Sequence, residues 1–309
     1  MVTRRDVLVG SGALAAASLL RPNSSLAAVR PRELIAKPGQ ARLMGSQEPA
    51  TPIWGYDGRV PGPTLRTKQG EEFAVDLVNE LPQPTTVHWH GVRINNAMDG
   101  VAGLTQKPVA PGGRFAYRFT PPDAGTYWYH PHNRTWEQLA RGLQGPLIVE
   151  EANAPSVDQD IALVIDDWRL DRDGKIHERS FGSMHDVTHA GRLGNVLTLN
   201  GKDNLDLQVQ AGERLRLRLI NSANARTIGV IFESHAPIVV ALDGQPVKAL
   251  FAPQRNMVFL APSQRADIVL DCNQGTGSKT PIMIDTGREK LQLGQLVYHP
   301  SQRKRAKVL

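Results

Sequence analysis

The chain has 309 residues, of which 40% are hydrophobic, and this length suggests about two domains. Its formal net charge of +6 lies at the two ends: residues 1–27 hold three arginines and one aspartate, and residues 303–309 hold two arginines, two lysines and no acid, so the body between them is neutral overall. A nucleic-acid-binding protein concentrates basic residues on its folded surface, and we therefore expect no nucleic-acid partner.

Residues 1–27 have the pattern of a cleaved export signal. Arg4 and Arg5 precede a short apolar stretch that runs to Leu20, and small residues at positions 25 and 27 fit a cleavage site. The paired arginines resemble those of a twin-arginine signal. The apolar stretch is short and rich in Gly and Ala, which argues against a membrane anchor. We therefore expect removal after about Ala27, a periplasmic or otherwise exported protein, and no membrane span in the mature chain.

The next informative feature is an internal repeat. Residues 65–79 align without gaps to residues 207–221, and both copies end in alternating apolar and polar residues followed by asparagine. This alternation is typical of a strand with one buried face. A gapless match that ends on the same residue type predicts two copies of one β domain.

Short strands separated by turn residues are predicted along the rest of the chain. Gly, Pro, Asn and Asp punctuate the apolar runs, and long amphipathic helical patterns are absent. We therefore expect an all-β chain with two tandem Greek-key β-sandwich or barrel domains, divided near residues 151–158. The further strands are expected at residues 112–120, 125–130, 145–150, 160–166, 195–199, 237–242, 256–260 and 266–271.

Two His-x-His pairs predict a metal site. His88 and His90 form the first pair, and His130 and His132 form the second. Side chains alternate faces along a strand, so the two histidines of a pair would point the same way, and neighbouring strands would bring four imidazoles together. Imidazole suits copper, zinc, iron and nickel. The paired spacing favours a metal site over ordinary surface or core histidines.

The repeat provides an internal control for these histidines. In the second copy, the position of the first pair is occupied by Val230-Ile231-Phe232, which contains no ligand. We align residues 125–132 with residues 265–272, which also contain no histidine. The fold itself therefore does not require the four histidines, and this favours a functional role for them.

Several motifs resemble those of the multicopper oxidase family, in its bacterial, exported, three-domain laccase-like form. They are His88-Trp89-His90-Gly91, residues 127–132 (YWYHPH), residues 142–149 (GLQGPLIV) and Asn200-Gly201. The resemblance covers residues 40–299. It implies a cupredoxin domain with the copper ligands over residues 40–152, a second cupredoxin domain without ligands over residues 155–299, and a basic tail or linker at 300–309.

The resemblance also implies roles for individual residues. His88 would bind the type 2 copper of a trinuclear centre, and His90, His130 and His132 would bind the type 3 pair. Family members reduce dioxygen to water at this centre while they oxidise a phenol, an amine or a metal ion at a separate blue copper. Asp99 follows His88 at the distance where many bacterial members have an acid that delivers protons to bound oxygen. An ordinary Asp-Gly turn is the alternative interpretation of Asp99.

Part of the family's ligand set is not found in the sequence. A complete member has a third set of histidines and a His-Cys-His motif, usually in a third domain. Cys272 is the only cysteine, has no flanking histidine, and is interpreted as a small strand residue. We therefore expect the first two domains of a three-domain oxidase, with an incomplete trinuclear centre and little or no turnover alone. The other histidines are interpreted as solvent or loop residues: His177, His185, His189, His235 and His299.

Two alternatives remain open at this point. An exported, non-catalytic scaffold or binding protein would keep the cupredoxin fold without needing copper ligands, which the retained histidines disfavour. A zinc site would use the same imidazoles, but copper(II) has the higher affinity for nitrogen ligands. Copper in an oxidase is therefore the leading hypothesis.

Overall fold

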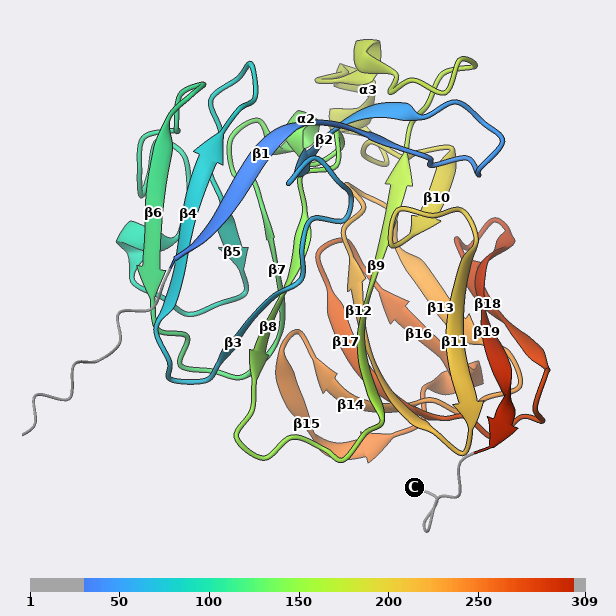
Figure 1. Cartoon of the computed structure of the whole chain (residues 1–309). Coiled ribbons are helices and arrows are strands. Elements are labelled where there is room, and N and C mark those ends of the chain that lie inside the picture. The colour runs from blue at the N-terminus through green and yellow to red at the C-terminus, as the bar shows by residue number, and fades with distance from the viewer. Residues whose placement is uncertain (1–30, 303–309) are drawn as a thin grey trace, which may run out of the picture. The chain divides into compact units, whose positions relative to one another are not determined.

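The computed structural model describes residues 31–302, which lie in one compact unit (Figure 1). Strands dominate this part of the chain, and its α-helices are the short α2 (Thr135–Gln138) and α3 (Met184–Thr188). The predicted all-β class is confirmed. No helix among the described residues is long and apolar enough to cross a membrane. The predicted export signal, residues 1–27, lies outside the described residues, as do residues 303–309 of the predicted tail.

Residues 32–150 form two four-stranded sheets, here called the N-terminal sandwich. One sheet has the strand order β2-β1-β4-β6, and the other has the order β3-β8-β7-β5. The elements are β1 (Arg32–Ala41), β2 (Thr51–Tyr56), β3 (Leu65–Lys68), β4 (Phe73–Asn79), β5 (His88–His90), the 3-10 turn η1 (Asn96–Met98), β6 (Arg114–Phe119), β7 (Gly125–His130) and β8 (Gly145–Glu150).

Alternating side chains fill the space between these two sheets. Leu77 of β4 and Tyr117 of β6 project from one sheet, and Trp89 of β5 projects from the other; all three are fully buried. The rings of Trp89 and Tyr117 meet edge to face at 5.3 Å. Because successive residues of a strand point to opposite faces, burial of Trp89 directs His88 and His90 to the other face of β5.

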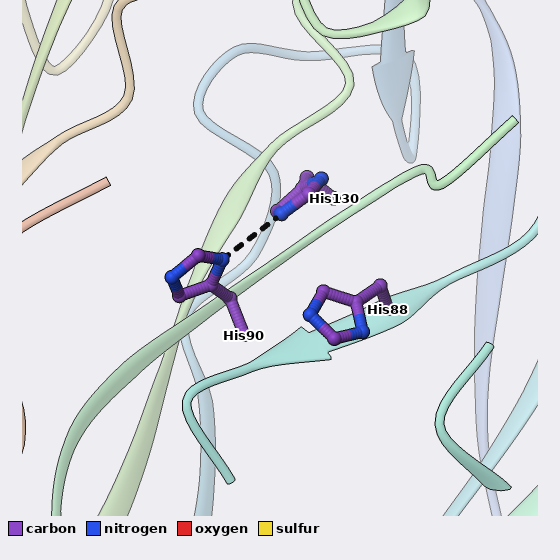
Figure 2. Close-up of side chains that lie close together, drawn as sticks. All are labelled: His88, His90 and His130. Atoms are coloured by element: carbon purple, nitrogen blue, oxygen red, sulfur yellow. Dashed lines mark hydrogen bonds between the residues drawn. The ribbon is translucent and has the colours of Figure 1, made fainter. Parts of the chain in front are cut away.

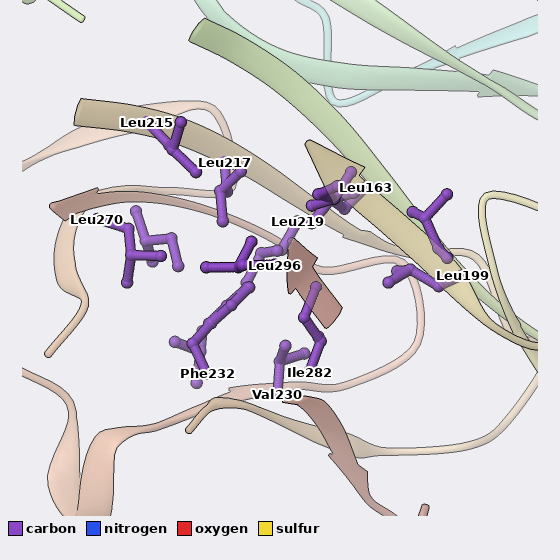
Figure 3. Packing of buried hydrophobic residues seen from close by; sticks show 14 of the residues in the cluster. Leu163, Leu199, Leu215, Leu217, Leu219, Val230, Phe232, Leu270, Ile282 and Leu296 are labelled. Carbon is purple, nitrogen blue, oxygen red and sulfur yellow. The ribbon is translucent and has the colours of Figure 1, made fainter. Parts of the chain in front are cut away.

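Residues 159–302 form a six-stranded and a five-stranded sheet, here called the C-terminal sandwich. Their strand orders are β10-β9-β12-β17-β14-β15 and β11-β19-β18-β13-β16. Alternate leucines of β12 face Phe232 and Leu296 of the second sheet (Figure 3). The elements are β9 (Gln159–Trp168), η2 (Glu178–Ser180), β10 (Val196–Leu199), β11 (Leu205–Ala211), β12 (Arg214–Asn221), β13 (Ile228–Phe232), β14 (Ile238–Leu242), β15 (Gln245–Phe251), η3 (Gln254–Asn256), β16 (Met257–Leu260), β17 (Arg265–Asp271), β18 (Lys279–Asp285) and β19 (Lys290–Gln302).

The two sandwiches repeat one strand arrangement. In the N-terminal sandwich, β1 runs parallel to β4 and β3 runs parallel to β8. In the C-terminal sandwich, β9 runs parallel to β12 and β11 runs parallel to β19. β13, which carries Val230 and Phe232, pairs with β18 as β5 pairs with β7. The predicted counterpart of residues 125–132 is wrong, because β17 pairs with β12 as β6 pairs with β4. β7 therefore corresponds to β18, which contains no histidine either.

Buried contacts hold β7 against the C-terminal sandwich. Arg218 of β12 is 1% exposed and donates hydrogen bonds to Thr126 of β7 (2.8 Å) and to Asp267 of β17 (3.1 Å). Thr126 itself donates to Asp267. Beside these polar groups, Trp128 packs against apolar residues of β9 and β12. The strand that carries His130 is thus fixed both by its neighbours β8 and β5 and by contacts to the C-terminal sandwich.

Candidate metal centre

The pairing of β5 with β7 brings three histidines together. His88 lies directly opposite His130, and His90 lies opposite Trp128. Opposite residues of an antiparallel pair share a face, so the three imidazoles gather on one side of the strands (Figure 2). Their ligand atoms all lie within 4.8 Å of one another. His90 Nδ1 and His130 Nε2 are 3.3 Å apart.

His132 lies just past the end of β7, beside these three. Its ring centroid is 5.3 Å from that of His88 and 6.4 Å from that of His130. Its backbone N–H donates to Thr86 Oγ1 (3.2 Å), which fixes the chain where it leaves the strand. His130 is buried, whereas His132 is exposed. The fold therefore places all four predicted histidines side by side, three in a tight group and the fourth at its exposed side.

Backbone carbonyls orient two of these rings. His88 Nδ1 lies 2.9 Å from the carbonyl oxygen of Asp99, and His130 Nδ1 lies 2.9 Å from that of Pro131. Because a carbonyl can only accept, each Nδ1 donates its hydrogen and the lone pair of each ring lies on Nε2, which for His130 faces His90 Nδ1. Metal-binding histidines are commonly held in this way through their second nitrogen.

Burial keeps the grouped imidazoles neutral. Burial, followed by the positive charge of Arg265, lowers the pKa of His90 to about 3. Burial also lowers the pKa of His130 well below its usual range, and the neighbouring histidines add to the shift. Burial lowers the pKa of His88 too, although hydrogen bonds to Asp99 oppose it. Metal ions bind neutral imidazole, so these rings offer lone pairs at neutral pH without first losing a proton.

This donor set fits copper. The group of three consists of imidazoles alone, and its atoms are close enough to share metal ions. Magnesium and calcium prefer oxygen ligands, so an all-nitrogen set disfavours them. Among the divalent ions that suit imidazole, copper(II) binds with the highest affinity.

Asp99 contacts one ring of this group and is partly exposed to solvent. It ends the turn η1, and Gly100 after it has φ +77°, so the Asp-Gly turn considered from the sequence is present. Its Oδ1 lies 3.3 Å from His88 Nδ1, and its side chain is 27% exposed. Asp99 therefore shapes a turn and also presents a carboxylate to a ring of the group.

Arg265 reaches the site from the C-terminal sandwich, and sequence reasoning did not single it out. It is 5% exposed and donates to the carbonyl oxygen of Thr126 (3.3 Å) and to Asp243 Oδ1 (3.0 Å). Its guanidinium lies against Gly91, where a Cβ atom would collide with Nη2. Gly91 follows His90 directly and has φ +86°. The glycine of the His-Trp-His-Gly motif thus leaves room for a buried cation beside the site. That glycine was the only feature of the sequence that could have indicated this contact.

The remaining predicted residues lie elsewhere. Cys272 lies one residue past the end of β17, so its interpretation as a strand residue is off by one position. It is 1% exposed in the core of the C-terminal sandwich, and burial raises its pKa to about 12, which disfavours a role as a copper ligand. His235 lies in a loop as expected, but its side chain is buried and its Nε2 is 2.6 Å from the Tyr298 hydroxyl. His235 therefore fits the loop interpretation, although its side chain is not exposed to solvent. His177 and His299 are exposed, as expected.

Known families and proteins match most of this chain. Two family models, each described as multicopper oxidase, match residues 38–154 and 159–300. The iron transport multicopper oxidase fetC of Epichloe festucae is 34% identical over 238 residues, which cover 75% of this chain and 37% of fetC. The multicopper oxidase MmcO of Mycobacterium tuberculosis is 29% identical over 293 residues, which cover 86% of this chain and 56% of MmcO. The chain thus spans about half the length, or less, of these curated relatives.

Solved structures show the same arrangement of strands. Lac15 from a marine microbial metagenome is 40% identical, with a TM-score of 0.77 over 91% of this chain and 70% of Lac15. A multi-copper oxidase from Pseudomonas Thermotolerans is 35% identical, with a TM-score of 0.79 over 89% of this chain and 66% of that protein.

Proposed function

Since this chain belongs to the multicopper oxidase family, we propose that His88, His90, His130 and His132 bind copper in a trinuclear centre. The observation that carries the proposal is the closeness of the ligand atoms of the first three, all within 4.8 Å of one another. In this assignment His88 binds the type 2 copper, and the other three bind the type 3 pair. The family membership expected from the motifs is confirmed, as is copper as the family's cofactor.

The reaction we propose is the family's reduction of dioxygen to water, coupled to oxidation of a phenol, an amine or a metal ion. Bound copper would supply the electrons to dioxygen. The residues of this chain hold the ions in place: His88 and His130 offer Nε2, because their Nδ1 atoms are held by the carbonyls of Asp99 and Pro131. Rings already held in position lose little freedom when the ion binds.

Asp99 would relay protons between solvent and the site. A proton donor must lie within hydrogen-bond reach of its partner, directly or through one water. The Asp99 carboxylate is 3.3 Å from the His88 ring, and its side chain is 27% exposed. It is therefore placed to take a proton from water and hold it beside the metal ligands.

The chain by itself would have little or no oxidase turnover. Blue copper, where family members accept electrons, needs a cysteine ligand. Cys272 is buried in an apolar core, and its raised pKa keeps it a thiol. We expect the purified 309-residue chain with copper to oxidise a phenolic dye no faster than free copper does. Robust turnover without another chain would overturn this part of the proposal.

Copper titration separates a metal site from a non-catalytic scaffold. We expect the wild-type chain to have a tight copper site that the double variant His88→Ala/His130→Ala lacks. His299→Ala, which removes an exposed histidine outside the group, is the matched control and should bind like the wild type. A wild-type chain without tight copper binding would support the scaffold, and tighter binding of zinc than of copper would support a zinc site.

Export to the periplasm completes the proposal. It is supported by Arg4 and Arg5 ahead of the apolar stretch in residues 1–27. Expression of the full chain should give a mature N-terminus close to residue 28 in the periplasmic fraction, and replacement of both arginines by lysine should block this export. Export that is indifferent to the replacement would contradict a twin-arginine route.

A further inference from the structure

A second pair of histidines lies outside the proposed copper centre. His185 lies in α3, and His189 follows the end of this helix, one turn later. Their rings stack with centroids 4.3 Å apart and an interplanar angle of 26°. Both residues are exposed, as expected for solvent histidines, but the spacing of four residues across one helical turn makes their rings neighbours, which was not predicted.

The free nitrogens of this pair point to a ligand role. His189 Nδ1 lies 3.0 Å from the carbonyl oxygen of His185, so it donates its hydrogen there and its Nε2 keeps a lone pair. Both side chains are exposed, so their rings can turn toward a common ion without opening the fold. Two histidines four residues apart on a helix are a known way to bind one metal ion, and here His185 lies in α3 and His189 is its C-cap residue.

The segment that carries the pair is firmly attached to the protein. Asp186, between the two histidines, accepts two hydrogen bonds from Arg169, at 2.8 and 3.0 Å. Ahead of α3, Phe181 lies against Trp136 of α2, with ring centroids 6.2 Å apart. Because α2 begins three residues after His132, the histidine-bearing segment packs on the part of the chain that follows the proposed copper centre.

We propose that His185 and His189 form a second copper(II) site, on the surface and separate from the four-histidine site. Copper(II) has the highest affinity among the divalent ions that suit imidazole. With two protein ligands, the other coordination positions are left to water, so the ion exchanges readily. The site therefore holds an exchangeable copper ion at the surface of the segment that packs on α2.

The test is a calorimetric copper(II) titration of the full chain in the His88→Ala/His130→Ala background, where the four-histidine site is removed. We expect one ion per chain to bind. His185→Ala and His189→Ala should each weaken this binding at least about tenfold, because either change leaves a single imidazole in place of a chelate. The matched control is His177→Ala, which removes an exposed histidine of the same loop and should leave binding unchanged.

Unchanged affinity in His185→Ala and His189→Ala would overturn the proposal. The proposal would also be overturned if each single variant bound half as much copper with unchanged affinity, because two independent histidines would behave in this way. The same substitutions in the otherwise unchanged chain should lower the number of bound copper ions by one, and this second measurement does not depend on the folding of the double variant. Failure of the four-histidine site to bind copper would leave these differences unchanged, so the two proposals are tested separately.

Discussion

Replacing Gly91 by alanine should destabilise the protein, and it should do so through Arg265. Gly91 has φ +86°, where an alanine costs about 1–2 kcal/mol. The new Cβ would also collide with Nη2 of Arg265, which is 5% exposed and bonded to Asp243. Forcing an extra methyl group into a packed site costs about 1–3 kcal/mol. The expected loss in the free energy of unfolding is therefore about 2–5 kcal/mol.

Gly103 provides the matched control for this substitution. It has a similar backbone angle, φ +78°, but a Cβ atom there would meet no atom within 4 Å. Gly103→Ala should therefore lower the free energy of unfolding only by the cost of the backbone conformation, about 1–2 kcal/mol. Urea unfolding followed by tryptophan fluorescence gives both free energies from the midpoint and slope of the transition.

The additional loss at Gly91 should disappear when Arg265 is removed. In an Arg265→Ala background, the cost of Gly91→Ala should fall close to that of Gly103→Ala, because the colliding Nη2 is gone and only Tyr127 Cδ1, 3.3 Å from the new Cβ, remains near. Equal losses at Gly91 and Gly103 in the parent chain would refute the contact. A loss at Gly91 that is the same with and without the arginine would refute it as well.

Three further predictions follow from single contacts. Asp99→Asn should weaken copper binding about tenfold, which is the low end of the effect of removing a hydrogen-bond partner of a metal-bound histidine, because the backbone carbonyl of residue 99 still holds His88 Nδ1. Copper titration measures this change, and an unchanged affinity would show that the carboxylate does not act on the ring. Burial lowers the pKa of folded His235 below 6.5, so below that pH the unfolded chain binds a proton that the folded chain does not, and stability is lost as the pH falls. His235→Gln should therefore make the dependence of the unfolding free energy on pH shallower by up to about 1.4 kcal/mol per pH unit. Urea unfolding between about pH 5 and pH 7 measures this slope, and the same slope in both proteins would contradict the prediction. Arg218→Ala should cost up to about 3–5 kcal/mol, because the buried Asp267 loses one of its two arginines and the partly exposed Asp160 loses its shortest ion pair. Arg114→Ala, at a side chain 63% exposed, should cost less than about 1 kcal/mol. Similar losses on urea unfolding would argue against the buried network.

Much of the fold was predictable because alternation and turn residues are local signals. Each of the eight further ranges expected to be strands overlaps one, and the repeat at 65–79 and 207–221 overlaps β3 with β4 and β11 with β12. β1 was not predicted because it contains Pro38 and Gly39, which usually indicate a turn. β15 was missed for another reason: it is an edge strand with almost all residues exposed, so it has no apolar period.

The site was predictable where its signal is periodic and unpredictable where it depends on tertiary contacts. The two-residue spacing of His88 and His90 already indicates a shared face, and pairing with β7 then brings His130 beside them. No local pattern indicates that Arg265 would lie beside His90, since the contact depends on how the two sandwiches pack. The closeness of His185 and His189 was not predicted, because the five residues of α3 are too few for a helical period to be recognised.

The most direct test of the four-histidine copper site is electron paramagnetic resonance of the full chain with one equivalent of copper(II). The His185→Ala/His189→Ala background keeps the proposed surface site out of the spectrum. We predict coupling of the bound copper to histidine nitrogens, which disappears when His88 and His130 are also replaced by alanine. A spectrum of unbound copper before that replacement, or nitrogen coupling that survives it, would contradict the site.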